Sequence, residues 1–230
     1  IVKSVFETSP IRQVASSQTI GTDQLDIMAD EDEAGASWGS EQGSVSESDT
    51  PELGKRSIFV HDLNAMPKAT QRILDDSNID IESWLAEKIA SKFSRTENTA
   101  FVSGTGVGQP RGFLTYDAGT SAGQIEQISS TSGTGGTLDQ DDFIKLLYGL
   151  KTPYQANAAF LMARGTEQVA RLLVDGNDQY IWQPGLQAGK PNTILGKPAV
   201  QADDMPAVAT DSLSVACGDF AQGYQIVDRA

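Results

Sequence analysis

The side chains that most often carry out catalysis are scarce in this sequence. Among its 230 residues there is one histidine, His61, and one cysteine, Cys217. A Ser-His-Asp or Cys-His arrangement would have to use this one imidazole, and no Gly-x-Ser-x-Gly motif accompanies it. The same two residues cannot supply the four ligands of a zinc site. We therefore predict no catalytic residue, no cofactor and no metal site, and we interpret His61 as a structural residue of a short strand at 57–61.

Clusters of acidic residues suggest two further kinds of chemistry, metal binding and hydrolysis. The run 30–33 lacks the Asp-x-Asp-x-Asp-Gly spacing of a calcium loop. Asp139, Asp141 and Asp142 lie where a helix is expected to begin, and carboxylates in a first turn complement the helix dipole without any catalytic role. A hydrolase with paired carboxylates stays open as an alternative, because the separation of carboxylates across a fold cannot be read from a sequence.

A glycine-rich stretch at 104–112 has some of the composition of a phosphate-binding loop. A P-loop would need Gly-Lys-Ser/Thr to close it, and a Gly-x-Gly-x-x-Gly motif would need glycine at Gln109 or Arg111. We predict instead a tight turn, in which the missing side chains let backbone segments approach closely.

The charge of the chain is strongly negative and unevenly placed. It carries 31 acidic and 17 basic residues, for a formal net charge of −14, which disfavours binding to nucleic acid through phosphate contacts. Between Arg12 and Lys55 there are ten acidic residues and no basic one. Alternating apolar residues predict a strand at 25–29 and a weaker one at 44–48. This segment is either a solvated acidic loop or a long hairpin that is ordered against a neighbouring subunit, with Trp38 as an anchor.

The remaining sequence predicts a mixture of helices and strands. Ser77 and Asp80 form a capping-box pattern before a helical apolar stripe of about four turns, with basic residues expected in its last turns. The stripe is Ile81, Trp84, Leu85, Ile89 and Phe93, and the basic residues are Lys88, Lys92 and Arg95.

Beyond residue 136 a second compact region is expected. Thr137 and Gln140 predict a cap for a helix with a stripe at 143–150, which Pro153 ends. Thr166 is expected to cap another helix, with Val169, Leu172 and Leu173 facing inward. Strands are predicted at 158–162, 179–183, 193–200, 212–217 and 224–228. This pattern is typical of an α+β fold around a central sheet.

No run of 18 apolar residues occurs in the sequence, so no membrane span is expected. The single cysteine excludes an intramolecular disulfide and fits a reducing compartment.

Six blocks of sequence occur in an order that carries more information than any one of them. They are Ser37-Trp38-Gly39-Ser40-Glu41; residues 74–85, with Leu74-Asp75-Asp76-Ser77; residues 97–113, with Gly104-x-Gly106-x-Gly108-Gln109-Pro110-x-Gly112-Phe113; Leu195-Gly196-Lys197-Pro198; Asp204-Met205-Pro206; and Gly218-Asp219-Phe220-x-x-Gly223-Tyr224. Together they resemble the major capsid protein family of tailed bacteriophages, with its Hong Kong 97 type coat fold.

This resemblance implies an architecture. Residues 1–60 would be an N-terminal arm and an extended β-hairpin loop that reaches over an adjacent subunit. Residues 61–135 would belong to a peripheral domain with a long spine helix. Residues 136–230 would form an axial domain with a central β-sheet and flanking helices. Family members usually continue to further peripheral strands, so we expect the peripheral sheet to be incomplete in this chain.

The resemblance also implies a function without catalysis. Subunits of the family assemble through hexamers and pentamers into an icosahedral shell around packaged double-stranded DNA, which they do not bind sequence-specifically. The implied location is the virion capsid, with assembly in the host cytoplasm, and implied partners are a portal, a scaffold, a maturation protease and decoration proteins. We predict contacts between subunits at Trp38, Glu41 and Arg12.

Two further expectations concern covalent crosslinks between subunits and the kind of particle that the subunits form. Some relatives crosslink through a lysine in the extended loop; because this chain has no lysine there, we expect a shell that is held together non-covalently. A bacterial nanocompartment shell of the encapsulin type is the alternative within the same fold, and the coat of a gene-transfer particle is not distinguishable from a phage coat by these blocks.

Overall fold

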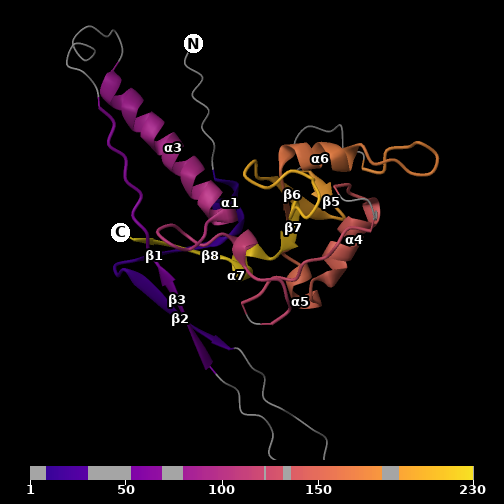
Figure 1. Cartoon of the computed structure of the whole chain (residues 1–230), viewed down its shortest axis with the longest axis horizontal. Helices are drawn as coiled ribbons and strands as arrows, with labels where there is room; N and C mark the ends of the chain where they lie inside the picture. Colours follow the sequence, from indigo (N-terminus) through magenta and orange to yellow (C-terminus); the bar gives the residue numbers. More distant parts are fainter. Residues whose placement is uncertain are drawn as a thin grey trace, which may run out of the picture.

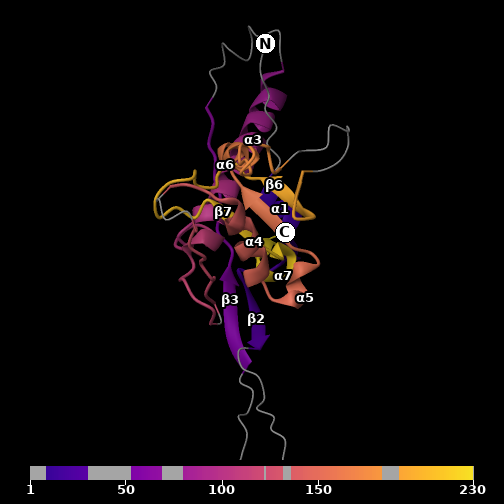
Figure 2. The same cartoon turned by 90° about the vertical axis from the view of Figure 1, so that its right-hand side faces the viewer.

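The structure is a computed structural model that describes residues 9–30, 53–68, 80–121, 123–131, 136–182 and 192–229. Figure 1 shows a long helix, α3 (Ile81–Ser103), and a β-hairpin that project in different directions from a more compact body. Turned by 90°, the molecule is narrow, with the hairpin and α3 extending at opposite ends (Figure 2). Within the described ranges no helix combines the length and the apolar character that a membrane span requires.

The compact part of the body, which we call the sheet region, is built on four strands in the order β5-β6-β4-β7. The strands are β4 (Ala159–Met162), β5 (Thr193–Ile194), β6 (Lys197–Gln201) and β7 (Val215–Gly218). β6 runs parallel and β7 antiparallel to β4, while β5 and β6 form a hairpin. Leu195 and Gly196 connect that hairpin at positive φ, +50° and +78°, as a two-residue turn of this hand requires.

Side chains of β4 point alternately into two cores. Phe160 and Met162 pack with Phe143 of helix α4 (Gln140–Gly149) and with Ala170 of helix α6 (Arg164–Arg171). Leu161 faces the other way, as strand periodicity requires, and joins a second core. All four residues of β4 are buried, so this strand is the centre of the molecule.

The second core joins segments from both ends of the chain. Ile11 of helix α1 (Pro10–Val14), Phe101 and Val102 of α3, and Ile226 of β8 (Gln225–Arg229) are buried in it. Strand β1 (Ser16–Ile20) pairs in parallel with β8, so the N-terminal segment lies against the last described strand. Three short helical elements complete the body: η1 (Phe113–Thr115), α5 (Thr152–Gln155) and α7 (Phe220–Gly223).

The acidic segment begins as the first strand of a hairpin. β2 (Gln24–Asp30) confirms the strand predicted at 25–29, and it pairs antiparallel with β3 (Leu53–Phe59). The strand predicted at 44–48 lies outside the described residues. β3 begins before the predicted strand at 57–61 and ends at Phe59, so the placement of His61 within a strand was wrong.

Three predicted helix starts differ from the structure. The cap of α3 is Asp80 itself, whose carboxylate accepts hydrogen bonds from the backbone N–H groups of Glu82 and Ser83. The cap of α4 is Asp139, which forms a capping box with Asp142. α6 begins at Arg164, so Thr166 lies inside its first turn and is buried without capping the helix.

The length of α3 and the buried face of α6 also differ from expectation. α3 continues to Ser103, so Lys88, Lys92 and Arg95 lie mid-helix, and its last turn contains no basic residue. The buried residues of α6 are Thr166, Glu167 and Ala170, whereas Val169 is 39 % exposed and Leu172, just after the helix, is 57 % exposed. Leu173 is partly buried against the core of the sheet region, as predicted.

The predicted strands after residue 170 are confirmed with two changes. The segment 193–200 is a hairpin rather than one strand. Around 179–182 there is only an isolated bridge between Val174 and Tyr180, and residue 183 lies outside the described residues.

Candidate assembly surfaces

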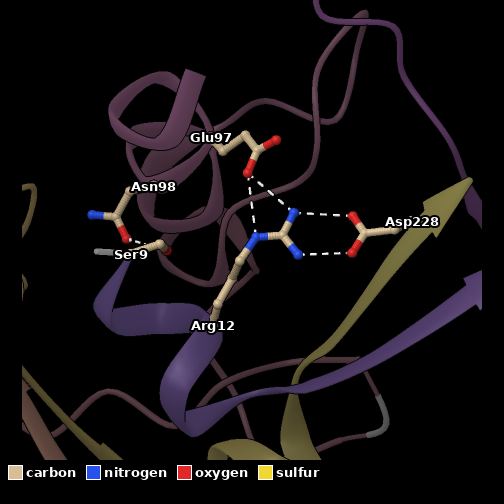
Figure 3. A network of polar contacts seen from close by, with 5 residues as sticks. All are labelled: Ser9, Arg12, Glu97, Asn98 and Asp228. Atoms are coloured by element: carbon tan, nitrogen blue, oxygen red, sulfur yellow. Dashed lines mark hydrogen bonds and ion pairs between the residues drawn. The ribbon is translucent and has the colours of Figure 1, made fainter. Parts of the chain in front are cut away.

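Arg12 joins three elements that are distant in sequence (Figure 3). Its guanidinium donates two hydrogen bonds to the carboxylate of Asp228 on β8, at 2.7 and 2.9 Å. It also donates to Glu97 of α3, from Nε at 3.2 Å and from an Nη at 3.0 Å. The bidentate pair fixes both distance and orientation, which a lysine in the same place would not do. Arg12 therefore ties α1 to α3 and to β8.

This contact network affects ionisation and continues into neutral groups. The hydrogen bond from Arg12 lowers the pKa of Asp228 below its ordinary value, and the same bond raises the pKa of Arg12. Beside it, the hydroxyl of Ser9 donates to Asn98 at 2.9 Å in a buried contact (Figure 3). Asp204, in the turn after β6, accepts hydrogen bonds from the side chains of Asn98 and Thr99. The C-terminal half of α3 is thus fixed to the body from two sides.

The glycine-rich stretch after α3 is a tight turn, as predicted. Gly106 and Gly108 have φ of +79° and +67°, and a Cβ on Gly112 would lie 2.5 Å from backbone atoms of Val102 and Ser103. The turn is closed by an antiparallel bridge between Thr105 and Arg111. Glycine is therefore required here for conformation and close approach, which accounts for the motif without a bound phosphate.

An aromatic cluster fixes this turn against the second core. Tyr224 donates from its hydroxyl to the carbonyl of Arg111 at 2.8 Å, and burial raises the pKa of Tyr224. Its ring makes edge contacts with Phe101 and Phe113, at centroid distances of 6.3 and 6.1 Å. Two of the sequence blocks, 97–113 and 218–224, therefore meet in space.

The N-terminal half of α3 has a different environment from its C-terminal half. The apolar stripe predicted there is only half-buried, and Trp84 is 36 % exposed. The buried residues of the helix all lie in its last turns: Asn98, Ala100, Phe101 and Val102. The described part of the chain therefore leaves the first turns of α3 with little packing.

A second set of exposed apolar side chains belongs to the sheet region. They follow α6 or occupy the β5–β6 turn, and they are Leu172 (57 % exposed), Val174 (46 %), Tyr180 (55 %), Ile181 (46 %) and Leu195 (49 %). We call these five residues the tip patch. Apolar side chains that are exposed close together are typical of surfaces that contact another protein, and we treat these five as the candidate contact surface of the sheet region.

Comparison with known proteins gives a consistent result. The model of the phage capsid family matches residues 1–230. The chain belongs to the phage capsid family. The capsid of a native GTA particle is similar at 38 % identity and a TM-score of 0.87, over 96 % of this chain and 76 % of that one. The capsid of an empty GTA particle is similar at 38 % identity and a TM-score of 0.88, over 97 % of this chain and 77 % of that one.

More distant structures share the fold alone. A structure from Mycobacterium phage Bobi has 15 % identity and a TM-score of 0.63, over 96 % of this chain and 72 % of that one. A comparison with curated proteins finds no match. The chain is thus a capsid protein with an α+β phage capsid fold, and the function that the resemblance implied is confirmed at the level of the family.

The predicted contact residues of this capsid protein are placed only in part. Trp38 and Glu41 lie outside the described residues. Arg12 is described, and its guanidinium is engaged within the chain by Glu97 and Asp228. A contact between Arg12 and another copy therefore stays a prediction, and it would have to compete with these ion pairs.

One hydrogen-bonded cluster of the capsid protein, around Glu167, was not found by sequence reasoning. The buried carboxylate of Glu167 accepts hydrogen bonds from Arg171 at 2.5 Å, from Asn192 at 3.0 Å and from Gln201. This cluster gives a structural reason for a buried acid, and it explains why that face of α6 turns inward. No motif signals it, because its members come from a helix, a loop and a strand. Among the described residues, no group of three or more His, Cys, Asp or Glu side chains is arranged to hold a metal ion.

Proposed function

We propose that this capsid protein forms an icosahedral shell by associating with copies of itself, through hexamers and pentamers, around packaged double-stranded DNA. The observation that carries the proposal is the 38 % identity and the TM-score of 0.87 to the capsid of a GTA particle, over 96 % of this chain. That similarity exceeds what a shared fold alone produces, and the capsid of that particle was computed with C5 symmetry. The phage and GTA capsids among its structural relatives favour a phage-type shell over a nanocompartment.

We assign three roles along the chain within that shell. The arm and hairpin, residues 1–60, reach over an adjacent copy, with Trp38 and Glu41 in contact with it. Residues 61–135, with α3 as a spine helix, form a peripheral domain. Residues 136–230 form an axial domain around the symmetry axes. The projecting hairpin and the exposed apolar side chains of the tip patch support this division.

The charge supports DNA enclosure without adhesion. The net charge of −14 opposes adhesion to a polyanion through phosphate contacts, so we expect the shell to enclose packaged DNA without binding it sequence-specifically. We expect the contacts between copies to be non-covalent, because no lysine lies between Arg12 and Lys55. A portal, a scaffold, a maturation protease or decoration proteins would act with this subunit, in the host cytoplasm during assembly and in the virion afterwards.

The test is assembly of the native, full-length subunit with one change at the tip patch. Leu172→Asp places a charge at an exposed apolar position of the proposed axial contact. We expect a folded subunit that sediments as a monomer or small oligomer, where the unchanged protein forms capsomers or shells by negative-stain microscopy. Burying an unpaired carboxylate in an interface is costly enough to block it.

Val107→Asp is the matched control, because Val107 is 83 % exposed in the turn after α3, outside the tip patch. This variant should assemble as the unchanged protein does. Failure of the unchanged subunit to form any particle would refute the proposed function. Normal assembly of Leu172→Asp would refute the axial role of the tip patch alone.

A further inference from the structure

The β2–β3 hairpin joins the body at its root, where two arginines lie. We define the root as the end of the hairpin at which the backbone N–H of Val60 donates to the carbonyl of Asp23, next to the body in Figure 1. Arg56 extends from β3, and Arg229 is the last residue of β8. The two side chains contact different parts of the molecule, so together they can fix the direction of the hairpin as well as its position.

Arg56 reaches from the hairpin into a groove of the body. The groove has a volume of about 820 Å³ and runs beside β7. Arg56 lines it from β3, while the other described lining residues lie between Phe113 and Tyr224. Among the described lining residues Arg56 carries the one basic side chain, and the acidic ones are Glu126, Asp142, Asp211 and Asp219. The charge of this groove therefore favours a cation in the place that Arg56 occupies.

The guanidinium of Arg56 lies against the backbone at Gly123. A Cβ on Gly123 would lie 3.2 and 3.3 Å from the two Nη atoms of Arg56, so any larger residue here would displace the guanidinium. The loop that contains Gly123 is closed by its own backbone. The N–H of Ile125 donates to the carbonyl of Asp117 at 2.9 Å, and the N–H of Gly119 donates to the carbonyl of Ile125 at 3.1 Å. Arg56 thus rests on a segment that is itself held in place.

A second contact holds the start of β2 to β8. Arg229 forms an ion pair with Asp23, which comes directly before β2. The carbonyl of Asp23 accepts from Val60 at 3.0 Å, so this contact is shared by both strands of the hairpin. The two charged side chains are 50 % and 86 % exposed, and such a pair stabilises weakly. It gives the hairpin a pivot, about which the hairpin could rotate if Arg56 did not provide a second point.

The length of the hairpin makes the angle at its root important. Met28 lies five residues beyond Asp23, which at about 3.4 Å per residue is about 17 Å along the strand. A rotation of about 10° at the root would therefore move Met28 by about 3 Å, which is as long as a hydrogen bond. A contact between copies that uses this hairpin needs its angle to be closely fixed.

We propose that Arg56 is a positioning residue for the contact between copies. By lying against Gly123 in the groove, it keeps the hairpin at one angle to the body in the free subunit, before another copy is contacted. Preorganisation of this kind lowers the entropic cost of association. The inference rests on the proposed function, in which the hairpin reaches over an adjacent copy.

The test measures where the hairpin lies in the free, full-length subunit. Met28→Cys and Tyr148→Cys, in a Cys217→Ala background, attach spin labels to the hairpin and to α4 at positions that are 69 % and 75 % exposed. Pulsed electron paramagnetic resonance gives the distribution of distances between the labels. We expect one narrow distribution in the otherwise unchanged protein. Arg56→Met should shift or broaden it by about 3 Å, the displacement that corresponds to a rotation of about 10°.

Two pairs of variants separate the contact from general effects of substitution. Lys55→Met is the control for Arg56→Met, because Lys55 is the neighbouring residue on β3 and pairs with Asp26 within the hairpin at 2.8 Å. Gly123→Asn should act as Arg56→Met does, since asparagine tolerates a positive φ but its side chain displaces the guanidinium. Gly108→Asn is its control, with a φ of +67° and no atom within 4 Å of an added Cβ. Both controls should leave the distribution narrow.

The positioning role and the proposed function fail in different ways. A broad distribution in the unchanged protein, or the same narrow one in Arg56→Met and Lys55→Met, would overturn the positioning role. A lower urea midpoint for Arg56→Met with an unchanged distribution would also overturn it, because Arg56 would then act on folding alone. We further expect Arg56→Met to need a higher concentration than Lys55→Met to form particles, and equal concentrations would exclude a role in assembly. Failure of the unchanged subunit to form particles would instead refute the proposed function, whatever the distances in the free subunit.

Discussion

The sheet region and the projecting elements of this capsid protein are built on different principles. In the sheet region, β4 is buried along its whole length, and Phe160 and Met162 pack between helices α4 and α6. In α3, by contrast, no described residue before Asn98 is buried, although the helix has 23 residues. The hairpin leaves Met28 and Phe59 largely exposed. One part of the molecule is stabilised by its own core, and the other presents apolar surface that the described residues leave uncovered.

This difference has an energetic meaning. Burial of apolar side chains is the main stabilising term in a domain, and an isolated helix is marginal in water. The sheet region therefore sets the stability of the free subunit. The first turns of α3 and the hairpin make few buried contacts among the described residues, so we expect them to contribute little to the stability of the free subunit.

The largest expected difference between the two parts concerns a pair of Phe→Ala substitutions, one in each part. Phe160→Ala removes a side chain with 0 % exposure that contacts Phe143 edge-on at 6.0 Å. We expect it to lower the free energy of unfolding of the free subunit by about 3–5 kcal/mol, because the cavity that it leaves cannot collapse fully. Urea unfolding followed by circular dichroism measures this loss.

Phe93→Ala is the matched change in the projecting part. Phe93 is half-buried on the stripe of α3, so we expect a loss of less than about 1 kcal/mol in the free subunit. Assembly should suffer more than folding, with a higher critical concentration for particle formation. Equal destabilisation by the two substitutions would contradict the division of the molecule into a self-sufficient and a dependent part.

Substitutions of Arg12, which links α1 to α3 and β8, should have the next largest effect on stability. Arg12→Met removes the bidentate contact to Asp228 and the contact to Glu97, and leaves both carboxylates without their cation. We expect a loss of about 1–2 kcal/mol, reduced by the partial exposure of these side chains. Arg12→Lys keeps the charge but not the fork geometry, so it should lie between the two proteins. If Arg12→Lys lowered the free energy of unfolding as much as Arg12→Met, the contact with Asp228 and Glu97 would depend on the geometry of the guanidinium and not on its charge.

The loss of stability caused by Arg12→Met should depend on pH in a defined direction. In the folded protein the hydrogen bond from Arg12 lowers the pKa of Asp228 from 3.8. The stabilisation is therefore fully present above pH 3.8 and is lost as the pH falls through the lowered value. The difference in unfolding free energy between the unchanged protein and Arg12→Met should shrink below pH 3.8 and stay constant above about pH 5. A difference that grows on acidification would contradict the role of Asp228.

Sequence patterns located the elements better than the contacts between them. Apolar periodicity correctly indicated α3, α4 and β4, because those patterns are local. The end of α3 was missed because the apolar stripe that defined the predicted helix stops at Phe93, whereas the helix continues through Thr96, Thr99 and Ser103, which have low helix propensity. In the structure their hydroxyls donate to the carbonyls four residues earlier, at 2.8, 3.0 and 3.2 Å, which keeps them inside the helix.

The contacts that position the assembly surfaces depend on distant residues. Arg12 and Asp228 are separated by 216 positions, and nothing in either local sequence indicates the other. Likewise, Val169 and Leu172 matched the helical pattern for inward residues. In the structure Thr166, Glu167 and Ala170 face inward instead, and the hydrogen bonds of Glu167 require Asn192 and Gln201 to be brought alongside by tertiary folding. The resemblance to a family supplied what such local patterns could not.

The smallest expected effect on stability concerns the first turns of α4 and α3. Asp142 accepts hydrogen bonds from the backbone N–H of Asp139 at 2.8 Å and from Thr131 at 2.7 Å, at the start of a helix packed on the sheet. Asp80 caps α3 at its exposed end, accepting from the N–H groups of Glu82 and Ser83 at 3.1 and 3.3 Å. We expect Asp142→Ala to cost about 1 kcal/mol of global stability, because it breaks the capping box with Asp139 and the hydrogen bonds from Thr131. Asp80→Ala should cost less than about 0.5 kcal/mol, because few contacts in the free subunit depend on those turns.

Hydrogen exchange separates the two cases where global unfolding is insensitive. In Asp80→Ala the amides of residues 82–86 should exchange faster in the free subunit, while amides of β4 keep their protection. In Asp142→Ala the whole sheet region should exchange faster, because α4 is part of its core. If Asp80→Ala also accelerated exchange in β4, the first turns of α3 would be coupled to the core, and the helix would have to be counted with the self-sufficient part of the subunit.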